Sequence, residues 1–309
     1  MKSLPKITII IPCKNSEKTI QRTFDSIRLQ NYENLECIVM DGSSTDNTLD
    51  IIEKNKDIIT HIISEEDKSG ADACNKAIKI SSGDLIGFLY SDDYLESTAL
   101  KELSLAYLNN LSISVFSYGL SIEKLNNKKI IFESDNKKNI NLTLNNILFK
   151  HVLNHFYKKE IFNKYGLYIP LFFDETIFFS NDREFMIRLA LNGVKNFVIE
   201  KVLYRMTTHE DSHTGNRKNI VKIRYEHIGI ADLHLKKSSL STYKKEKLID
   251  FKSHNLALLL IYYLYKLDVN NFIAIIIRGY KLKKFFWFLD IVKCPISEVL
   301  YRCSVKKWI

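Results

Sequence analysis

Glycine and proline are scarce in this chain, which has 10 and 4 of them in 309 residues. We therefore expect no long disordered linker. The five cysteines lie far apart, and no two have the spacing of a metal-binding pair, so we expect reduced thiols and neither a disulfide framework nor a zinc site. With 46% hydrophobic and 26% charged residues, the composition is that of a globular protein with a substantial core.

Long apolar runs are also missing. The apolar run near the N-terminus is short and ends at Pro12, so it lacks the h-region of a signal peptide. The longest apolar stretch, Leu256 to Tyr265, is followed by Lys266 and Asp268 and is shorter than the roughly 18 residues that a membrane span requires. We therefore expect a cytoplasmic protein.

Strand and helix patterns alternate in the first half of the chain. Apolar strand patterns cover residues 7–11, 35–40, 61–63 and 85–90, and helical patterns cover 20–27, 48–59, 72–80 and 97–109. This alternation predicts an α/β protein with a mixed, mainly parallel sheet flanked by helices. Because ligands bind at the carboxyl ends of parallel strands, the polar residues that follow three of these strands are expected to meet at one edge. They are Lys14, Asn15, Asp41, Asp92 and Asp93.

The pattern changes after the first hundred residues. Residues 113–118 and 129–132 predict a hairpin, residues 181–191 a helix, and residues 197–199 and 203–206 short strands. From Ile220 onward the sequence is helical, basic and rich in aromatic residues. We therefore predict a catalytic domain at 1–215 and a helical C-terminal region at 216–309.

Adjacent aspartates at a strand end suit a cation that binds phosphates. A diphosphate leaving group gains negative charge as its bond to a sugar breaks, and Mg²⁺ or Mn²⁺ held by one or two carboxylates neutralises that charge. Taken alone, the pair Asp92-Asp93 is more typical of a helix cap, Asp41 of a turn and Asp72 of a helix N-terminus.

The combination of motifs is more specific. Four stretches in order closely resemble family 2 glycosyltransferases, which have the GT-A fold. They are Ile9–Glu17, Val39–Asp46, Ser64–Ala77 and Ser82–Asp93. The resemblance is continuous over about the first 100 residues and patchier to about residue 215. Ala71 and Cys74 depart from the family, which often has an aromatic residue and Met there, and this leaves the donor sugar open.

The resemblance implies a role for each matching residue on the donor side. Asp41 would bind the base or ribose, Asp72 would lie near the nucleotide or the donor sugar, and Asp92 would face the donor. Asp93 would ligate the divalent metal, either Mn²⁺ or Mg²⁺. The residues expected to line the nucleotide pocket are Pro12, Lys14, Asn15 and Glu17.

The resemblance extends to the acceptor side. His155 lies in a stretch that borders the acceptor site in the family, and Asp182 lies in the segment that carries the catalytic base. An inverting transfer needs one carboxylate to take the proton of the attacking hydroxyl, and we assign that role to Asp182, with Glu184 as its substitute. His213, or else His209, would add a metal or phosphate contact from a late loop.

The net charge of +9 favours an anionic partner. In the C-terminal region, Lys281 to Phe288 combines lysines with three phenylalanines and a tryptophan, which is typical either of a helix that packs on the catalytic domain or of one that lies on a membrane. We favour peripheral contact with the inner face of the cell membrane. The sequence does not indicate the oligomeric state.

We therefore predict an inverting glycosyltransferase, a hexosyltransferase that uses a nucleotide-sugar, most often a UDP-sugar in this family. The expected acceptor is a lipid-linked sugar in bacterial surface-polysaccharide synthesis. A nucleotidyltransferase-like enzyme is an alternative, but residues 11–16 lack the glycines of a triphosphate loop. A basic nucleic-acid-binding protein is another, but no binding motif supports it. The intact Asp92, Asp93 and Asp182 argue against a non-catalytic relative.

Overall fold

The computed structural model describes residues 3–124, 130–133, 142–148, 154–165, 174, 176–208, 219–284 and 287. The chain divides into two compact units, Met1–His209 and Glu210–Ile309. The boundary predicted between residues 215 and 216 lies outside the described residues.

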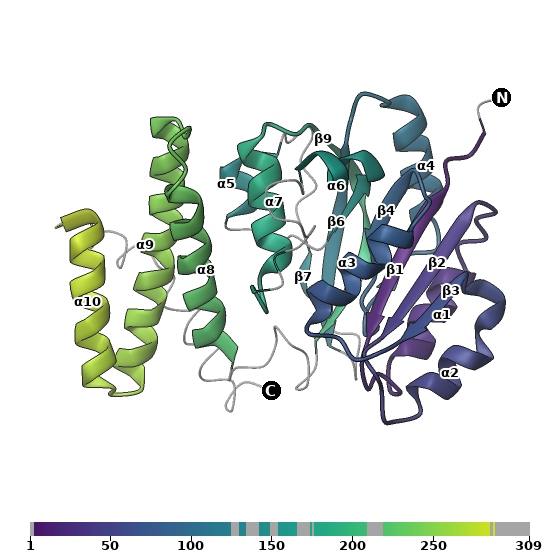
Figure 1. Ribbon diagram of the computed structural model, residues 1–309, viewed down its shortest axis with the longest axis horizontal. Coiled ribbons are helices and arrows are strands. Elements are labelled where there is room, and N and C mark those ends of the chain that lie inside the picture. Colours follow the sequence, from purple (N-terminus) through teal and green to yellow (C-terminus); the bar gives the residue numbers. More distant parts are fainter. Residues whose placement is uncertain are drawn as a thin grey trace. The chain divides into compact units, whose positions relative to one another are not determined.

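The N-terminal unit begins with four parallel strands in the order β3-β2-β1-β4 (Figure 1). Their connections are mainly helical, as the alternating pattern predicted. The strands are β1 (Ile7–Cys13), β2 (Leu35–Asp41), β3 (His61–Ser64) and β4 (Leu85–Phe88). The helices are α1 (Ile20–Arg28), α2 (Thr48–Lys54), a 3₁₀ turn η1 (Lys56–Ile58) and α3 (Gly70–Ile80). All seven residues of β1 are buried, which explains why its sequence is apolar apart from Thr8, whose hydroxyl donates a hydrogen bond of 2.6 Å to Glu36.

The second half of the sheet is mixed. Strand β8 (His155–Lys158) runs antiparallel between β4 and β6 (Val115–Lys124), while β9 (Asn196–Thr208) is parallel to β6. The predicted hairpin is confirmed, because β7 (Ile130–Glu133) pairs antiparallel with β6. The two short strands predicted at 197–199 and 203–206 form the single strand β9. The remaining elements are β5 (Tyr94–Leu95), α4 (Ala99–Asn109), α5 (Leu144–Ile147), α6 (Lys159–Tyr165) and α7 (Asn181–Leu191).

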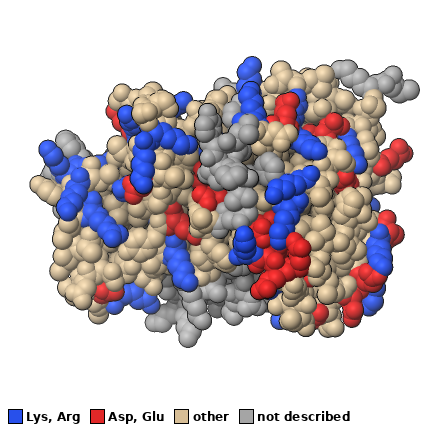
Figure 2. Space-filling view, viewed as in Figure 1, with Lys and Arg blue, Asp and Glu red and all other residues tan. Residues whose placement is uncertain are grey.

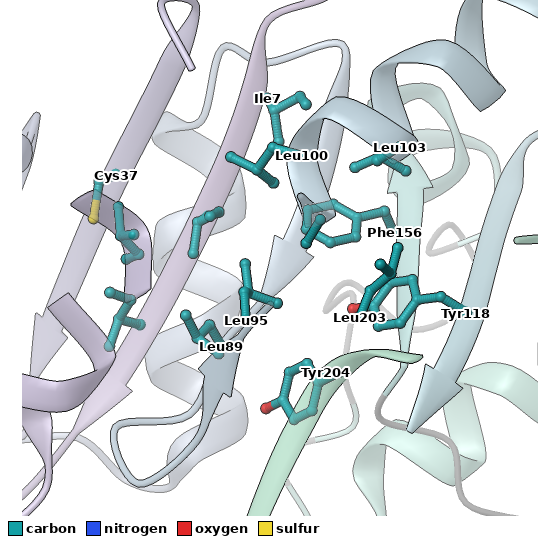
Figure 3. Close-up of a cluster of buried hydrophobic side chains, with 14 of the residues drawn as sticks. Ile7, Cys37, Leu89, Leu95, Leu100, Leu103, Tyr118, Phe156, Leu203 and Tyr204 are labelled. Atoms are coloured by element: carbon teal, nitrogen blue, oxygen red, sulfur yellow. The ribbon is translucent and has the colours of Figure 1, made fainter. Parts of the chain in front are cut away.

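A continuous core joins the two halves of the sheet (Figure 3). Phe156 of β8 lies so close to Gly87 of β4 that a Cβ atom at Gly87 would come within 2.2 Å of the Phe156 ring. Tyr118 of β6 stacks on Tyr204 of β9, with ring centroids 6.4 Å apart. Because of this packing, the end of β9 lies next to the loop that follows β4.

The described residues of the C-terminal unit form three helices: α8 (Ile220–Leu235), α9 (Thr242–Tyr265) and α10 (Val269–Lys283). They pack around an apolar cluster that includes Ile228, Leu256, Leu259, Ile275 and Trp287. The predicted helical character is confirmed for residues 220–283. Over the described part of the chain, no helix combines the length and the hydropathy of a membrane span.

Candidate active site

The loops after β1, β2 and β4 meet at the carboxyl edge of the parallel strands. The Gly42 amide donates a hydrogen bond of 2.9 Å to the carbonyl of Cys13, and the Leu89 amide donates one of 3.0 Å to Ile10. The hydroxyl groups of Ser16 and Ser91 are 2.8 Å apart and hydrogen-bonded. The structure thus brings together the three loops that the sequence analysis selected.

Side chains link the loop after β1 to the loop after β2. The Asn15 side-chain oxygen accepts a 2.9 Å hydrogen bond from the Thr45 amide, and Glu17 accepts one of 3.0 Å from the Asn47 amide. Asn15 has φ of 50°, in the left-handed region, which asparagine tolerates better than most residues. The structure shows that Asn15 and Glu17 hold these two loops together, and the prediction that they line a nucleotide pocket stays a prediction.

Two further residues of the predicted nucleotide pocket differ in exposure. Lys14 is exposed, so its ammonium group can reach a phosphate at the sheet edge. Pro12 is buried within β1 and lies opposite Met40 of β2. Its position suits a residue that shapes the backbone of the following loop.

Asp41 lies at the end of β2 with only 1% of its surface exposed. Its carboxylate accepts hydrogen bonds from the Ser64 hydroxyl at 2.6 Å and from the Ser44 amide at 3.0 Å. The carboxylate therefore connects the ends of β2 and β3. A role in binding the base or ribose stays a prediction.

The N-terminus of α3 carries a group of acidic residues around one lysine. Lys76 Nζ lies 2.7 Å from the Glu65 carboxylate, 3.2 Å from that of Asp67 and 2.9 Å from that of Asp72. Hydrogen bonds to these carboxylates, the one to Glu65 foremost, raise the pKa of Lys76. Asp67 also lies at the loop after β2, because a Cβ atom at Gly42 would be 3.3 Å from its carboxylate oxygen. Asp67 and Lys76 are candidate site residues to which the sequence analysis gave no role.

Asp72 occupies the third position of α3, and Ser69 is the N-cap. The Ser69 hydroxyl accepts a hydrogen bond of 3.3 Å from the Asp72 amide, and the Asp72 carboxylate accepts one of 3.2 Å from the Lys68 amide. Burial raises the pKa of Asp72, but the hydrogen bonds from Lys76 and Lys68 outweigh it and lower the pKa below its usual value. Asp72 is therefore held as a carboxylate next to the site.

Asp92 and Asp93 have different environments although they are neighbours. Asp93 is 2% exposed, and its two carboxylate oxygens accept hydrogen bonds from the Tyr204 hydroxyl at 2.6 Å and the Thr207 amide at 2.7 Å. Burial, together with the charge of Asp92, raises its pKa well above the usual value. Asp92 is partly exposed. The metal role of Asp93 stays a prediction, but because Asp93 is buried and Asp92 is partly exposed, Asp92 is the more accessible of the two carboxylates to a cation.

Two residues of α1 hold the loop that carries these aspartates. The Arg22 guanidinium donates hydrogen bonds to the Asp92 carbonyl at 2.7 Å and to the Thr207 hydroxyl at 2.6 Å. The Thr23 hydroxyl donates to the carbonyls of Ser91 at 3.1 Å and Asp93 at 2.8 Å. Neither residue was predicted, because the only signal that this helix carries in the sequence is the spacing of its apolar residues.

Removing the Tyr204 hydroxyl is expected to destabilise the fold. In Tyr204→Phe, the buried Asp93 carboxylate loses one of its two donors, which costs about 1–3 kcal/mol of unfolding free energy. Thermal unfolding measures this effect. Tyr94→Phe is a matched control, because the Tyr94 hydroxyl bonds to Glu123, which keeps its ion pair with Arg205 at 3.1 Å. Equal stability of the two variants would contradict the importance of the Asp93 contacts.

Asp182 lies in the first turn of α7 and is partly exposed. One carboxylate oxygen accepts a 2.6 Å hydrogen bond from the Arg183 amide. Burial raises the pKa of Cys74 in α3 and of Tyr90 just before the aspartate pair, and the nearby charge of Asp182 contributes to both shifts. Helix α7 packs on β8, because the Tyr157 hydroxyl donates a hydrogen bond of 3.1 Å to Met186 Sδ, and β8 pairs with β4. Asp182, at the start of α7, therefore lies near the end of β4 and near Cys74 of α3.

Glu184, the predicted substitute for Asp182, has a different position. It is fully buried, and its carboxylate forms an ion pair of 2.8 Å with Arg188 one turn later. A buried carboxylate in such a pair stabilises the helix and its packing and is poorly placed to meet a substrate. The structure therefore favours Asp182 as the candidate base.

His155 begins β8 and is 8% exposed. Its ring stacks on Tyr157, with centroids 6.1 Å apart. It lies one residue beyond the Gly87–Phe156 pair, next to the carboxyl end of β4. His209 and His213 lie outside the described residues. Among the residues that are described, no three His, Cys, Asp or Glu side chains form a group able to hold a metal ion by themselves.

Known proteins with similar sequences are bacterial sugar transferases. The chain is 37% identical over 127 residues to UDP-Glc:alpha-D-GlcNAc-diphosphoundecaprenol beta-1,3-glucosyltransferase WfgD of Escherichia coli, covering 40% of this chain and 49% of that one. It is 27% identical over 252 residues to the GalNAc(5)-diNAcBac-PP-undecaprenol beta-1,3-glucosyltransferase of Campylobacter jejuni, covering 78% and 79%. The matched part of this chain thus spans about half the length of the Escherichia coli enzyme and 79% of the length of the Campylobacter jejuni enzyme.

Solved structures share the fold. The Staphylococcus aureus TarS fragment 1–349 in complex with UDP matches with a TM-score of 0.65 and 20% identity, over 98% of this chain and 93% of that one. The mannosyltransferase PcManGT of Pyrobaculum calidifontis, in complex with GDP-Man and Mn²⁺, matches with a TM-score of 0.61 and 16% identity, over 99% and 87%. The predicted GT-A fold with its helical C-terminal region is confirmed. The model of the glycosyl transferase family 2 matches residues 8–166, just over half of the chain, and the chain therefore belongs to this family.

Proposed function

We propose that this protein is an inverting glycosyltransferase that moves a hexose or N-acetylhexosamine from a UDP-sugar to a sugar acceptor. The observation that carries the proposal is the meeting of three strand-end loops with Asp92 and Asp182 at one edge of the sheet. Support also comes from the two relatives described above. The name of the Escherichia coli enzyme specifies UDP-Glc as donor, and both names specify an undecaprenol-linked sugar.

A divalent cation fits the residues at this edge. Mg²⁺ and Mn²⁺ sites for nucleotides use one or two protein carboxylates and complete their coordination with phosphate oxygens. Asp92 is partly exposed here, while Asp93 is buried and its two oxygens accept hydrogen bonds from the Tyr204 hydroxyl and the Thr207 amide. When bound, the cation would neutralise charge on the departing diphosphate. His213, predicted as a second ligand, lies outside the described residues.

The residues around the cation position have distinct tasks in this proposal. Asp182 accepts the proton of the acceptor hydroxyl as its oxygen attacks the anomeric carbon. Lys14 is exposed at the same edge and offers a positive charge to the phosphates. Asp41 and Asp72 border the nucleotide and the donor sugar, and His155 borders the acceptor. Arg22 and Thr23 hold the Asp92 loop in place through its backbone carbonyls.

The proposed acceptor is a lipid-linked oligosaccharide of surface-polysaccharide synthesis, and the proposed place of action is the inner face of the cell membrane. Both relatives described above are named for acceptors linked to undecaprenol, a long-chain lipid. An enzyme that uses such an acceptor must work at the membrane surface, which agrees with peripheral attachment of the C-terminal region.

Calorimetric titration of UDP, GDP and CMP into the full chain tests the donor site. We expect UDP to bind in the presence of Mn²⁺ or Mg²⁺ and to bind at least tenfold more weakly without the cation, because a cation held by Asp92 would neutralise the charge of the phosphates. GDP and CMP should bind more weakly than UDP. Failure of all three nucleotides to bind with either cation would contradict the proposed function.

A further inference from the structure

Helix α10 is apolar on two sides, and only one of them is buried. Ile275 is fully buried, and Gly279 allows Trp287 to pack so closely that a Cβ atom at position 279 would lie 2.1 Å from its ring. A second set of large apolar residues on the same helix is exposed by about half or more. These residues are Val269 at 64%, Ile273 at 49%, Ile277 at 49% and Tyr280 at 55%.

The exposed residues form one stripe along the helix. At about 100° per residue, the side chains of Val269, Ile273, Ile277 and Tyr280 fall within an arc of about 80°. The turn between α9 and α10 adds Leu267, which is 83% exposed. We call these five residues the α10 stripe. Single exposed apolar residues are ordinary, but a continuous stripe of this kind marks an interaction surface.

The charge around the α10 stripe is positive. Residues 1–209 contain 26 Lys and Arg against 27 Asp and Glu, whereas residues 210–309 contain 19 against 9. The entire net charge of the protein thus comes from the C-terminal unit. Lys266 and Lys281 lie next to the stripe and are exposed. Asp268, the N-cap of α10, is a partly exposed acidic neighbour, whereas α10 itself contains no acidic residue. Figure 2 shows Lys and Arg outnumbering Asp and Glu over the visible surface of the C-terminal helices.

We propose that the α10 stripe and its flanking lysines dock onto an anionic phospholipid surface. Apolar side chains at the acyl boundary with cations at the headgroups are the arrangement of an interfacial helix. A second copy of this chain is a poorer partner, because pairing two α10 stripes would bring like charges together. The inference extends the proposed function by naming the surface that would hold the enzyme near a lipid-linked acceptor.

Vesicle sedimentation of the full chain tests this surface. We expect binding to vesicles of phosphatidylcholine with phosphatidylglycerol, and at least tenfold weaker binding to phosphatidylcholine alone. The double variant Ile273→Gln and Ile277→Gln should lower partitioning onto the anionic vesicles at least tenfold. Both positions are exposed and glutamine favours helix, so the fold should persist.

The control is matched in exposure. Leu105 and Leu111, both 49% exposed, lie in the N-terminal unit, and their double replacement by Gln should leave vesicle binding unchanged. Equal loss in both double variants, or unchanged binding of the α10 variant, would overturn the inference. So would self-association of the wild-type chain that the α10 variant abolishes, since the surface would then bind a second copy. UDP titration of each variant separates these results from the proposed function, because an intact donor site without vesicle binding refutes only the docking surface.

Discussion

Replacing Asp92 with Asn is expected to lower kcat/KM for sugar transfer by at least about 100-fold, the cost typical of removing one group that stabilises transition-state charge. Asn has the shape of Asp but no negative charge, so the cation would lose its protein carboxylate. The backbone carbonyl of Asp92, which binds Arg22, is unaffected by the change, so the loop should keep its position. The measurements are initial rates of UDP release with a UDP-sugar and cation-dependent binding of UDP. Thermal unfolding should remain close to that of the wild-type chain.

Asp93→Asn provides the contrast to Asp92→Asn. The Asp93 oxygens accept hydrogen bonds from Tyr204 and Thr207, and an amide group can accept on only one of its two terminal atoms. We therefore expect loss of thermal stability as the first effect of this variant. If Asp93→Asn unfolded like the wild-type chain and lost cation-dependent UDP binding, while Asp92→Asn kept it, the metal role would return to Asp93 as the sequence analysis predicted.

Replacing Asp182 with Asn is expected to lower kcat by about 10²–10⁴-fold, the usual contribution of a positioned general base. The variant removes the group that accepts the proton of the acceptor hydroxyl. It leaves the loops after β1, β2 and β4 intact, so UDP affinity should change by no more than about twofold. Steady-state rates and calorimetric titration of UDP on the same preparation separate the two effects.

Two other carboxylates on or before α7 serve as controls for Asp182. Glu184→Gln breaks the buried ion pair with Arg188 and should destabilise the fold by about 3–5 kcal/mol, with activity lost only through unfolding. Asp174→Asn alters a turn in which the carboxylate accepts a 2.9 Å hydrogen bond from the Thr176 amide, and its activity should stay close to the wild-type level. Asp182 would not be the base if its variant kept full kcat, or if it lost UDP binding to the same degree as activity.

The parallel half of the sheet was predictable because each strand is a short apolar run that ends in polar residues. In β1, for example, both faces are buried, so residues 7–11 are isoleucine at every position except Thr8. The mixed half was not predictable in the same way. Strand β9 pairs with β6, which lies about 80 residues earlier, and the sequence gives no local signal for such a pairing. The apolar pattern of the sequence therefore predicted two short strands where the structure has the single strand β9.

The candidate site, like the sheet, was predictable from the sequence only in part. Motif spacing was enough to select Asp41, Asp92 and Asp182, because each follows or begins a recognisable element. The spacing could not distinguish Asp92 from Asp93, since that difference arises from Tyr204 and Thr207, over 100 residues later in the chain. Arg22 was missed for a related reason, because its partners, the Asp92 carbonyl and the Thr207 hydroxyl, come together only in the folded chain.

The hydrogen bonds between the loops after β1 and β2 affect the thermodynamics of donor binding. Asn15 accepts a hydrogen bond from the Thr45 amide and Glu17 one from the Asn47 amide, while Asp41 accepts one from the Ser64 hydroxyl. These hydrogen bonds form without any ligand. The conformational entropy of these loops is thus lost during folding and is not lost again when a nucleotide arrives. Binding of UDP should therefore show a small heat-capacity change that reflects only the surface covered by the nucleotide. Removing one link, as in Asn15→Ala, should weaken binding through a less favourable entropy, although Asn15 need not touch the ligand.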